Sequence, residues 1–194
     1  MANKQNKKEK ILETATSLFS KFGLDKTTMN DIADHLQMGK ATLYYYFQNK
    51  LDIYKEVVKN ETEGIKDAIL AAIEKADTPQ EKIIAYVVTR IENVHEIFNY
   101  YGNVRSKEPI LPKFPVIDEL REDFDNFEKE LINQLLTEGI EKDVFKIQDL
   151  ELATRAFYAG VRGSEYQLAH DNTIDNIQED IETLMNMIFK GIEK

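Results

Sequence analysis

The chain has 194 residues, carries a formal net charge of −10 at pH 7 and contains no cysteine. This length allows one large domain or two small ones with a buried core, and the lack of cysteine excludes disulfides and thiol catalysis. No apolar run approaches the length of a membrane span and the polar N-terminus has no signal-peptide core, so we expect a soluble, cytoplasmic protein without a membrane partner.

Apolar residues at helical spacing predict three helices in the first quarter of the chain. The first covers residues 7–22 and is followed by Gly23, at the position that favours a left-handed residue after a helix. Thr28 and Asp31 resemble a capping box that starts the second helix. A connection too short for any other structure leads into the third helix, so residues 28–50 predict a helix-turn-helix.

The remainder of the sequence also predicts helices. Asn49 and Asp52 start a long helix that runs to about residue 75. Further helices are predicted over residues 78–101, 116–138, 148–169 and 173–192. Gly139 is expected to stop the helix before it, and residues 102–115, which hold three of the four prolines, form the irregular connection. No alternating strand pattern or internal repeat is present, so the sequence predicts an all-α protein.

The last two predicted helices carry two rows of similar residues. Small residues recur at three- and four-residue spacing at Ala153, Ala156, Gly160 and Gly163, and branched residues recur at Ile174, Ile177, Ile181, Leu184, Ile188 and Ile192. Glycine within a helix costs about 1 kcal/mol relative to alanine, and close approach of another helix is the usual reason for it. The row of branched residues on the last helix, here called the seam, fits either the core of a monomer or a four-helix interface in a homodimer, and we predict the interface.

The predicted third helix has an outward side suited to nucleic acid. That side carries a cation, a hydroxyl and aromatic rings, at Lys40, Thr42, Tyr44, Tyr45 and Tyr46. Residues 1–55 hold nine lysines and six acidic residues, whereas residues 56–194 hold sixteen basic and twenty-nine acidic residues. A basic end would approach a polyanion while the acidic body stays off it, although a chance lysine cluster on a solvated face would look the same.

Residues 9–54 resemble the DNA-binding domain of the TetR family of bacterial transcriptional regulators. The residues that match its pattern are Ile11, Ala15, Phe19, Gly23, Thr28, Ile32, Ala33, Lys40, Thr42, Leu43, Tyr44, Phe47 and Lys50. Two positions depart from it, because Gln37 stands where the family usually has glycine and Gly39 where it commonly has a capping serine. Glycine is an acceptable N-cap, whereas a positive φ at Gln37 would carry strain.

The resemblance implies a division into a helix-turn-helix domain at 1–48 and a helical ligand-binding and dimerisation domain at 49–194. It also implies roles for the DNA-facing residues. Thr28 and Asn30 would contact phosphate, and Lys40 would contact a guanine edge. Ala41 and Thr42 would touch a thymine methyl group. Tyr44 and Lys50 would bind the DNA backbone, whereas Tyr45 and Tyr46 would contact either phosphate or base. Plain packing between the domains is the alternative for the tyrosines.

The same resemblance implies an inducer pocket between the middle helices. Candidate lining residues are Tyr86, Arg90, Asn93, His95, Phe98, Tyr101, Arg105, Arg121, Phe124, Phe127 and Phe157. Pockets use a few polar groups to orient a mostly apolar ligand. The three arginines would favour an anionic ligand such as an acyl thioester, or would form surface ion pairs with the abundant acids.

Enzyme motifs and metal sites find no support in the sequence. Residues 39–42 read Gly-Lys-Ala-Thr, but the hydroxyl does not directly follow the lysine and no strand precedes it, so a P-loop is excluded. The three histidines are too far apart for metal-ligand spacing. We therefore predict a ligand-responsive dimeric repressor without cofactor, bound to a near-palindromic operator and released by a small inducer. A helical protein-interaction module without specific DNA binding and an unrecognised helical enzyme are the alternatives.

Overall fold

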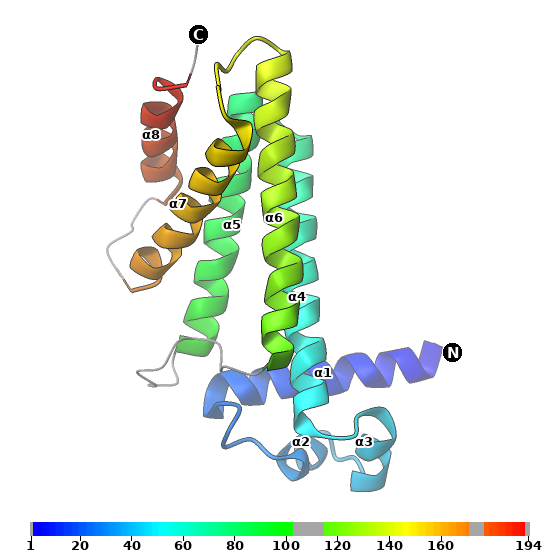
Figure 1. The fold of residues 1–194 in the computed structure, drawn as a ribbon. Helices are drawn as coiled ribbons and strands as arrows, with labels where there is room; N and C mark the ends of the chain where they lie inside the picture. The colour runs from blue at the N-terminus through cyan, green and yellow to red at the C-terminus, as the bar shows by residue number, and fades with distance from the viewer. Residues whose placement is uncertain (1, 103–114, 171–176, 193–194) are drawn as a thin grey trace. The chain divides into compact units, whose positions relative to one another are not determined.

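The computed structural model describes the backbone of residues 2–102, 115–170 and 177–192, and the side chains of residues 5–93, 122–163 and 178–192 (Figure 1). Within these residues every regular element is an α-helix, which confirms the all-α prediction. The chain divides into two compact units. The first consists of Met1–Thr62 and Phe98–Leu120, and the second of Glu63–Ile97 and Arg121–Lys194.

The first unit contains the predicted helix-turn-helix. Its helices are α1 (Ala2–Phe22), α2 (Met29–His35), α3 (Lys40–Tyr46) and the beginning of α4 (Lys50–Glu74). α2 packs against both α1 and α3 (Figure 1). The apolar core of this unit includes Ile11, Ala15, Phe19, Ile32, Leu43, Phe47 and Ile53. These residues belong to all four helices, so a single small core fixes the position of α3.

Local sequence signals account for the ends of these helices. Gly23 has a φ of 85°, the left-handed conformation predicted for the residue after α1. Thr28 and Asp31 form the predicted capping box at the start of α2. In the turn, Gln37 has a φ of 49°, so this non-glycine residue adopts the strained conformation that its position in the family pattern suggested. Gly39 is the N-cap of α3, as predicted.

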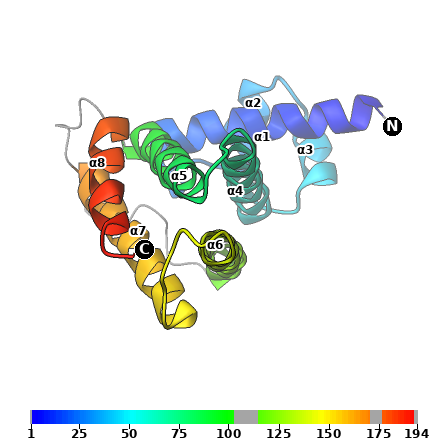
Figure 2. The same ribbon diagram turned by 90° about the horizontal axis from the view of Figure 1, so that it is seen from above.

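The second unit contains α5 (Pro79–Gly102), α6 (Pro115–Glu141), α7 (Leu150–His170) and α8 (Ile177–Phe189), with the later part of α4. α4, α5 and α6 run alongside one another, and α7 runs at an angle to them (Figures 1 and 2). The shared core includes Ile69 of α4, Tyr86 and Ile91 of α5, Leu135 of α6, Val161 of α7 and Phe189 of α8. Among the described residues, no helix is long and apolar enough to cross a membrane.

A capping box starts α5, and charged hydrogen bonds hold the end of α6. Thr78 and Glu81 form a capping box at the start of α5, with Thr78 N donating to Glu81 Oε2 at 2.9 Å and Glu81 N to Thr78 Oγ1 at 3.2 Å. Near the end of α6, Glu138 accepts hydrogen bonds from Lys142 at 2.7 Å and Lys82 at 2.8 Å. These bonds, that from Lys142 first, hold the pKa of Glu138 below its ordinary 4.5.

The prediction that Gly139 stops a helix is wrong. α6 continues to Glu141, and the left-handed residue after it is Asp143, with a φ of 61°. Gly139 is instead the point where the ring of Phe145 lies against the helix, because a Cβ there would stand 2.0 Å from Cδ2 of that ring. Phe145 is 1% exposed and stacks on Phe189 with ring centroids 5.7 Å apart. Glycine is required for close approach, not for termination.

The predicted single seam on α8 is split between two faces. Ile181 is buried in the core of its own subunit together with Met185 and Phe189, so it is not a free interface residue. Leu184 and Ile188 are 53% and 39% exposed. The side chains of Ile174 and Ile177 lie outside the described residues.

Three of the four small residues in the row on α7 face away from the core. Ala153 is half-buried against the core, whereas Ala156, Gly160 and Gly163 are exposed. A Cβ added at Gly160 or Gly163 would meet no described atom within 4 Å. Packing within the described part of one subunit therefore gives no reason for these two glycines.

Candidate nucleic-acid interface and ligand site

α3 presents one face to the core of the first unit and the other to solvent. Leu43 is 0% exposed and anchors the helix, and Phe47 lies buried directly after it. The opposite face carries Lys40, Ala41 and Thr42, all exposed, with Tyr44 50% exposed and Tyr45 68% exposed. A cation, a hydroxyl and two phenol groups thus project together from a rigidly held helix, which is the chemistry that contacts phosphates and base edges.

Tyr46 differs from its two neighbours. It is half-buried and packs against the core of the first unit. Its ring also meets that of Tyr45 edge-on, with centroids 5.3 Å apart and planes at 90°. The ring of Tyr46 therefore supports the ring of Tyr45. Because Tyr46 is half-buried, less of its own side chain is accessible to DNA than that of Tyr45.

The hydroxyl of Thr28 is committed to the cap of α2. Thr28 Oγ1 accepts from Asp31 N at 3.2 Å and donates to Asp31 Oδ2 at 2.7 Å, and Thr28 N donates to the same oxygen at 2.8 Å. These hydrogen bonds from Thr28 hold the pKa of Asp31 below its ordinary value. A phosphate contact by this hydroxyl would have to replace the cap. Asn30 lies in the first turn of α2 and its side chain is exposed.

Lys50 fastens the connection between α1 and α2. Its Nζ donates to the backbone oxygen of Leu24 and, at 3.4 Å, to that of Asp25. A half-buried ammonium group held in this way is a tether within the domain, in contrast to the DNA-backbone clamp expected from the resemblance. Lys8 is likewise engaged, with Glu56 Oε1 2.5 Å from its Nζ. Lys40 is the exposed cation on α3 itself.

The second unit holds a charged cluster deep in its core. Arg90 of α5 is 1% exposed and Glu128 of α6 is 0% exposed. Arg90 Nε donates to Glu128 Oε1 at 2.5 Å and Nη2 to Oε2 at 3.3 Å, and the buried Tyr86 hydroxyl donates to Oε1 at 2.8 Å. From the sequence, Arg90 was expected either to bind an anionic ligand or to form an ion pair on the surface. In the structure it forms a buried ion pair with Glu128 instead.

Comparison with known proteins identifies the first unit. Residues 11–57 match the model of the family described as bacterial regulatory proteins, tetR family. A biofilm operon icaADBC HTH-type negative transcriptional regulator, IcaR of Staphylococcus epidermidis, is 45% identical over 53 residues, which are 27% of this chain and 29% of that protein. IcaR of Staphylococcus aureus strain Newman is 33% identical over 89 residues, 46% of this chain and 48% of that one.

A solved structure extends the likeness over the whole chain. The crystal structure of a transcriptional regulator from Cytophaga hutchinsonii is 27% identical, with a TM-score of 0.73 over 96% of this chain and 98% of that one. Over residues 11–57 the chain therefore carries the N-terminal domain of the TetR family. It spans about half or less of the length of the curated IcaR relatives that it matches.

The remaining pocket candidates whose side chains the structure describes are mostly core residues. Phe124 is buried, and Phe127 and Phe157 pack partly buried against the core. Asn93 Nδ2 donates to the backbone oxygen of Thr89 in its own helix at 2.8 Å. The predicted residues His95, Phe98, Tyr101, Arg105 and Arg121 lie outside the described side chains.

Glu128 was not predicted from the sequence, although its position carried a signal. Glu128 follows Phe124 by four residues and precedes Leu131 by three, so it occupies a core position on the apolar stripe of α6. A carboxylate at such a position requires a buried partner. Arg90, which the sequence analysis names as a candidate pocket residue, is that partner.

A second polar network joins α7 to α6 nearer the surface. Arg162 Nη1 donates to Asp125 Oδ1 at 2.5 Å and to the hydroxyl of Tyr158 at 3.3 Å. Burial, followed by the hydrogen bond with Asp125, raises the pKa of Tyr158 to about 12. Tyr158 therefore stays protonated at neutral pH and acts as a hydrogen-bonding group, not as an anion.

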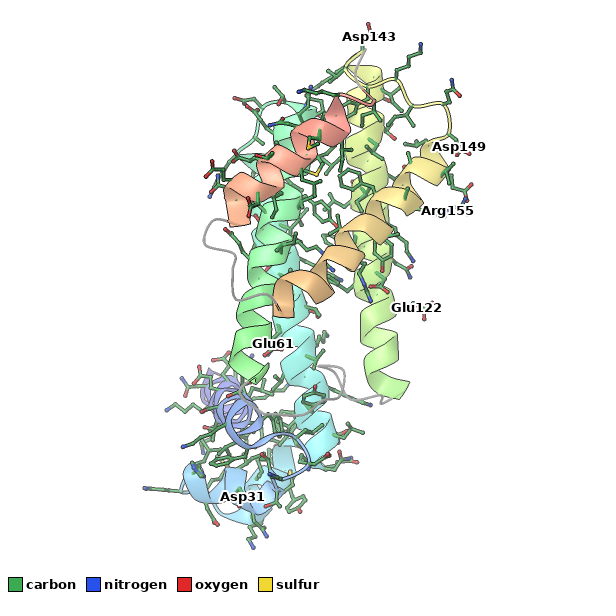
Figure 3. The ribbon with its side chains drawn as sticks, turned by 90° about the vertical axis from the view of Figure 1, so that its left-hand side faces the viewer. Asp31, Glu61, Glu122, Asp143, Asp149 and Arg155 are labelled. Carbon is green, nitrogen blue, oxygen red and sulfur yellow. The ribbon has the colours of Figure 1, made fainter. Side chains whose placement is uncertain are left out.

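Three other charged residues of the second unit point outward. The labelled side chains of Glu122, Asp149 and Arg155 project away from its helices (Figure 3). Arg155 lies 3.6 Å from Glu151, and both side chains are more than half exposed, at 65% and 83%. In the part of the chain that the structure describes, no group of three or more histidine, aspartate or glutamate residues could hold a metal ion.

Proposed function

We propose that this TetR-family protein is a dimeric, ligand-responsive repressor of transcription that binds a near-palindromic operator. The observation that carries the proposal is the exposed face of α3, with Lys40, Thr42 and Tyr44 outward and Leu43 buried behind them. The IcaR relatives, which match 53 and 89 residues of this chain, are negative transcriptional regulators. A DNA-bound regulator of this kind acts in the bacterial cytoplasm.

The proposed DNA contacts follow the exposure of the side chains. Lys40, at the start of α3, reaches guanine acceptors in the major groove, and the methyl groups of Ala41 and Thr42 touch thymine methyl groups. Tyr44 and Tyr45, both half exposed or more, donate to phosphates. Lys50 supports this surface from behind by holding the connection before α2.

Two copies of α7 and α8 form the proposed dimer interface. The open face of α7 at Ala156, Gly160 and Gly163 allows close approach of a second helix. Leu184 and Ile188 of α8 supply exposed apolar area beside it. A two-fold dimer would present two recognition helices to half-sites about 34–36 Å apart.

We infer that a small amphipathic ligand binds in the second unit and releases DNA. The buried polar cluster around Glu128 in an otherwise apolar core supports this, because ligand sites combine apolar walls with a few polar groups. A ligand that lowers DNA affinity a hundredfold must bind the DNA-free form a hundredfold better, a coupling of about 2.7 kcal/mol. α4 (Lys50–Glu74), whose residues belong to both units, is the proposed transmitting element.

Selection of bound fragments from genomic DNA tests the proposal. We expect enrichment of near-palindromic fragments, with Lys40→Ala weakening operator binding by about 1–3 kcal/mol and relaxing specificity at one base of each half-site. Lys75→Ala removes the same charge at an exposed position at the end of the long helix and serves as the matched control. Equal losses in both variants, or no enriched fragment, would contradict DNA recognition by α3 and favour a protein-interaction module.

A further inference from the structure

The turn between α2 and α3 holds a strained residue. Gln37 has a φ of 49°, in the left-handed region that glycine adopts without strain and that other residues seldom enter. Its N–H donates to the backbone oxygen of Asp34 at 3.1 Å, and the N–H of Met38 donates to that of Ala33 at 2.9 Å. These two hydrogen bonds form the Schellman motif that ends a helix, in which the left-handed position is usually glycine. The backbone of the turn therefore requires a left-handed residue there but no side chain.

The side chain of Gln37 has no partner in the described part of the fold. Gln37 is exposed, whereas the next residue, Met38, packs partly buried against the core of the first unit and holds the turn in place. Among the residues that the structure describes, the carboxamide of Gln37 forms no hydrogen bond. Glycine, which the family pattern usually has here, would avoid the strain. A strained residue whose side chain the fold does not use suits a contact outside the fold.

We propose that Gln37 contacts the operator, and that its side-chain amide donates a hydrogen bond to a backbone phosphate beside each half-site. This inference rests on the proposed function, in which α3 enters the major groove. Gln37 precedes Gly39, the N-cap of α3, and Lys40, the first residue of that helix, so it lies just outside the element that enters the groove. Base edges form the floor of the groove and phosphates line its edges, so a residue just outside the helix meets phosphate.

The engagement of two other residues makes a donor at this position useful. Thr28 and Lys50 are expected from the resemblance to bind phosphate or the DNA backbone. The hydroxyl of Thr28 is held in the capping box of α2, and Lys50 Nζ donates to backbone oxygens of the connection before α2. A glutamine side chain is neutral and carries two N–H donors, so it bonds to a phosphate oxygen without forming an ion pair. Gln37 thus supplies an exposed donor where those two groups are already bound within the first unit.

Fluorescence anisotropy with the full-length protein tests the contact on two duplexes, the fragment most enriched in the genomic selection and a shuffled duplex of the same composition. Gln37→Gly removes the amide, so we expect both duplexes to be bound about five- to tenfold more weakly. It also relieves strain, which offsets the greater entropy of unfolded glycine, so Tm should stay equal or rise by up to about 4 °C. Asp143→Gly, at the other described non-glycine residue with a positive φ, is the matched control and should leave DNA binding unchanged.

Two charged substitutions separate a phosphate contact from an effect on the turn. Gln37→Glu keeps the shape and the backbone restriction, but its carboxylate repels phosphate, so binding of both duplexes should fall at least about tenfold. Gln37→Lys should bind at least as tightly as wild type, with a salt slope steeper by about 1 per subunit. Gln178→Glu makes the same change of charge at an exposed position of α8 and is the control. An unchanged salt slope in Gln37→Lys, or Gln37→Glu binding as tightly as Gln178→Glu, overturns the proposal.

The pattern of losses separates this inference from the function on which it rests. Specific operator binding that is equal in wild type, Gln37→Gly and Gln37→Glu would refute the contact and leave the repressor assignment in place. A loss confined to one base pair of the half-site would identify a base contact and would also refute the phosphate contact. Equal wild-type binding of both duplexes, weakened alike by Gln37→Glu, would remove the repressor assignment and support the contact. Circular dichroism melts of every variant verify that the proteins compared are folded.

Discussion

Replacing Gly139 by alanine tests how closely the end of α6 is packed. A Cβ at this position would stand 2.0 Å from Cδ2 and 2.3 Å from Cε2 of the Phe145 ring. The ring has little room to move, because it is 1% exposed and stacks on Phe189 with centroids 5.7 Å apart. Alanine therefore has to displace a buried aromatic side chain.

Two opposing free-energy terms set the size of the effect. At an open position in a helix, alanine is favoured over glycine by about 1 kcal/mol. Overpacking a filled core costs about 1–3 kcal/mol, and displacing the ring loses up to about 3 kcal/mol of apolar burial. We expect Gly139→Ala to lower the free energy of unfolding by about 1–2 kcal/mol. In a chain of this size that lowers Tm by about 2–8 °C.

Gly64→Ala is the matched control for this measurement. Gly64 lies inside α4 and is exposed, and an added Cβ would meet no described atom within 4 Å. The helix-propensity term then acts alone, so Gly64→Ala should raise Tm slightly. Thermal melts followed by circular dichroism at equal protein concentration compare the variants. A Gly139→Ala protein as stable as Gly64→Ala would refute the packing argument.

Three further predictions concern the dimer, acid stability and the tether of the first unit. Gly160→Leu should give monomer or a much weaker dimer in light scattering while Gly64→Leu leaves the dimer intact, and a tight Gly160→Leu dimer would exclude this face of α7. Because the pKa of Glu138 is lowered in the folded state, its carboxylate stabilises the fold above its ordinary pKa of 4.5, and this stabilisation is lost as the pH falls through the lower folded pKa. The difference in Tm between wild type and Glu138→Gln should therefore disappear over that pH range. A difference in Tm that stays constant would contradict the ion pairs. Lys50→Ala should lower Tm through the loss of two hydrogen bonds to backbone oxygens, with the salt dependence of operator binding unchanged; a salt slope lower by about 1 per subunit would instead identify a phosphate contact.

The sequence by itself determined the helices and the helix-turn-helix. Apolar spacing and caps act over three or four residues, so they are readable before any tertiary contact exists. The capping box of Thr28 and Asp31, the left-handed Gly23 and the Gly39 N-cap all appear where the sequence predicted them. The exposed face of α3 was predictable for the same reason, because burial of Leu43 fixes the direction of its neighbours.

Only the tertiary structure decided which distant residues meet. Arg90 and Glu128 are 38 residues apart, and their pairing depends on the register of α5 against α6, which no local pattern encodes. The same holds for Lys50, whose ammonium reaches a backbone oxygen 26 residues earlier in the chain. Gly139 was misread because glycine after a helical run signals an end only when no side chain, such as Phe145, needs its space. Side-chain partners across helices are set by packing of the whole core, and that packing is what local periodicity leaves open.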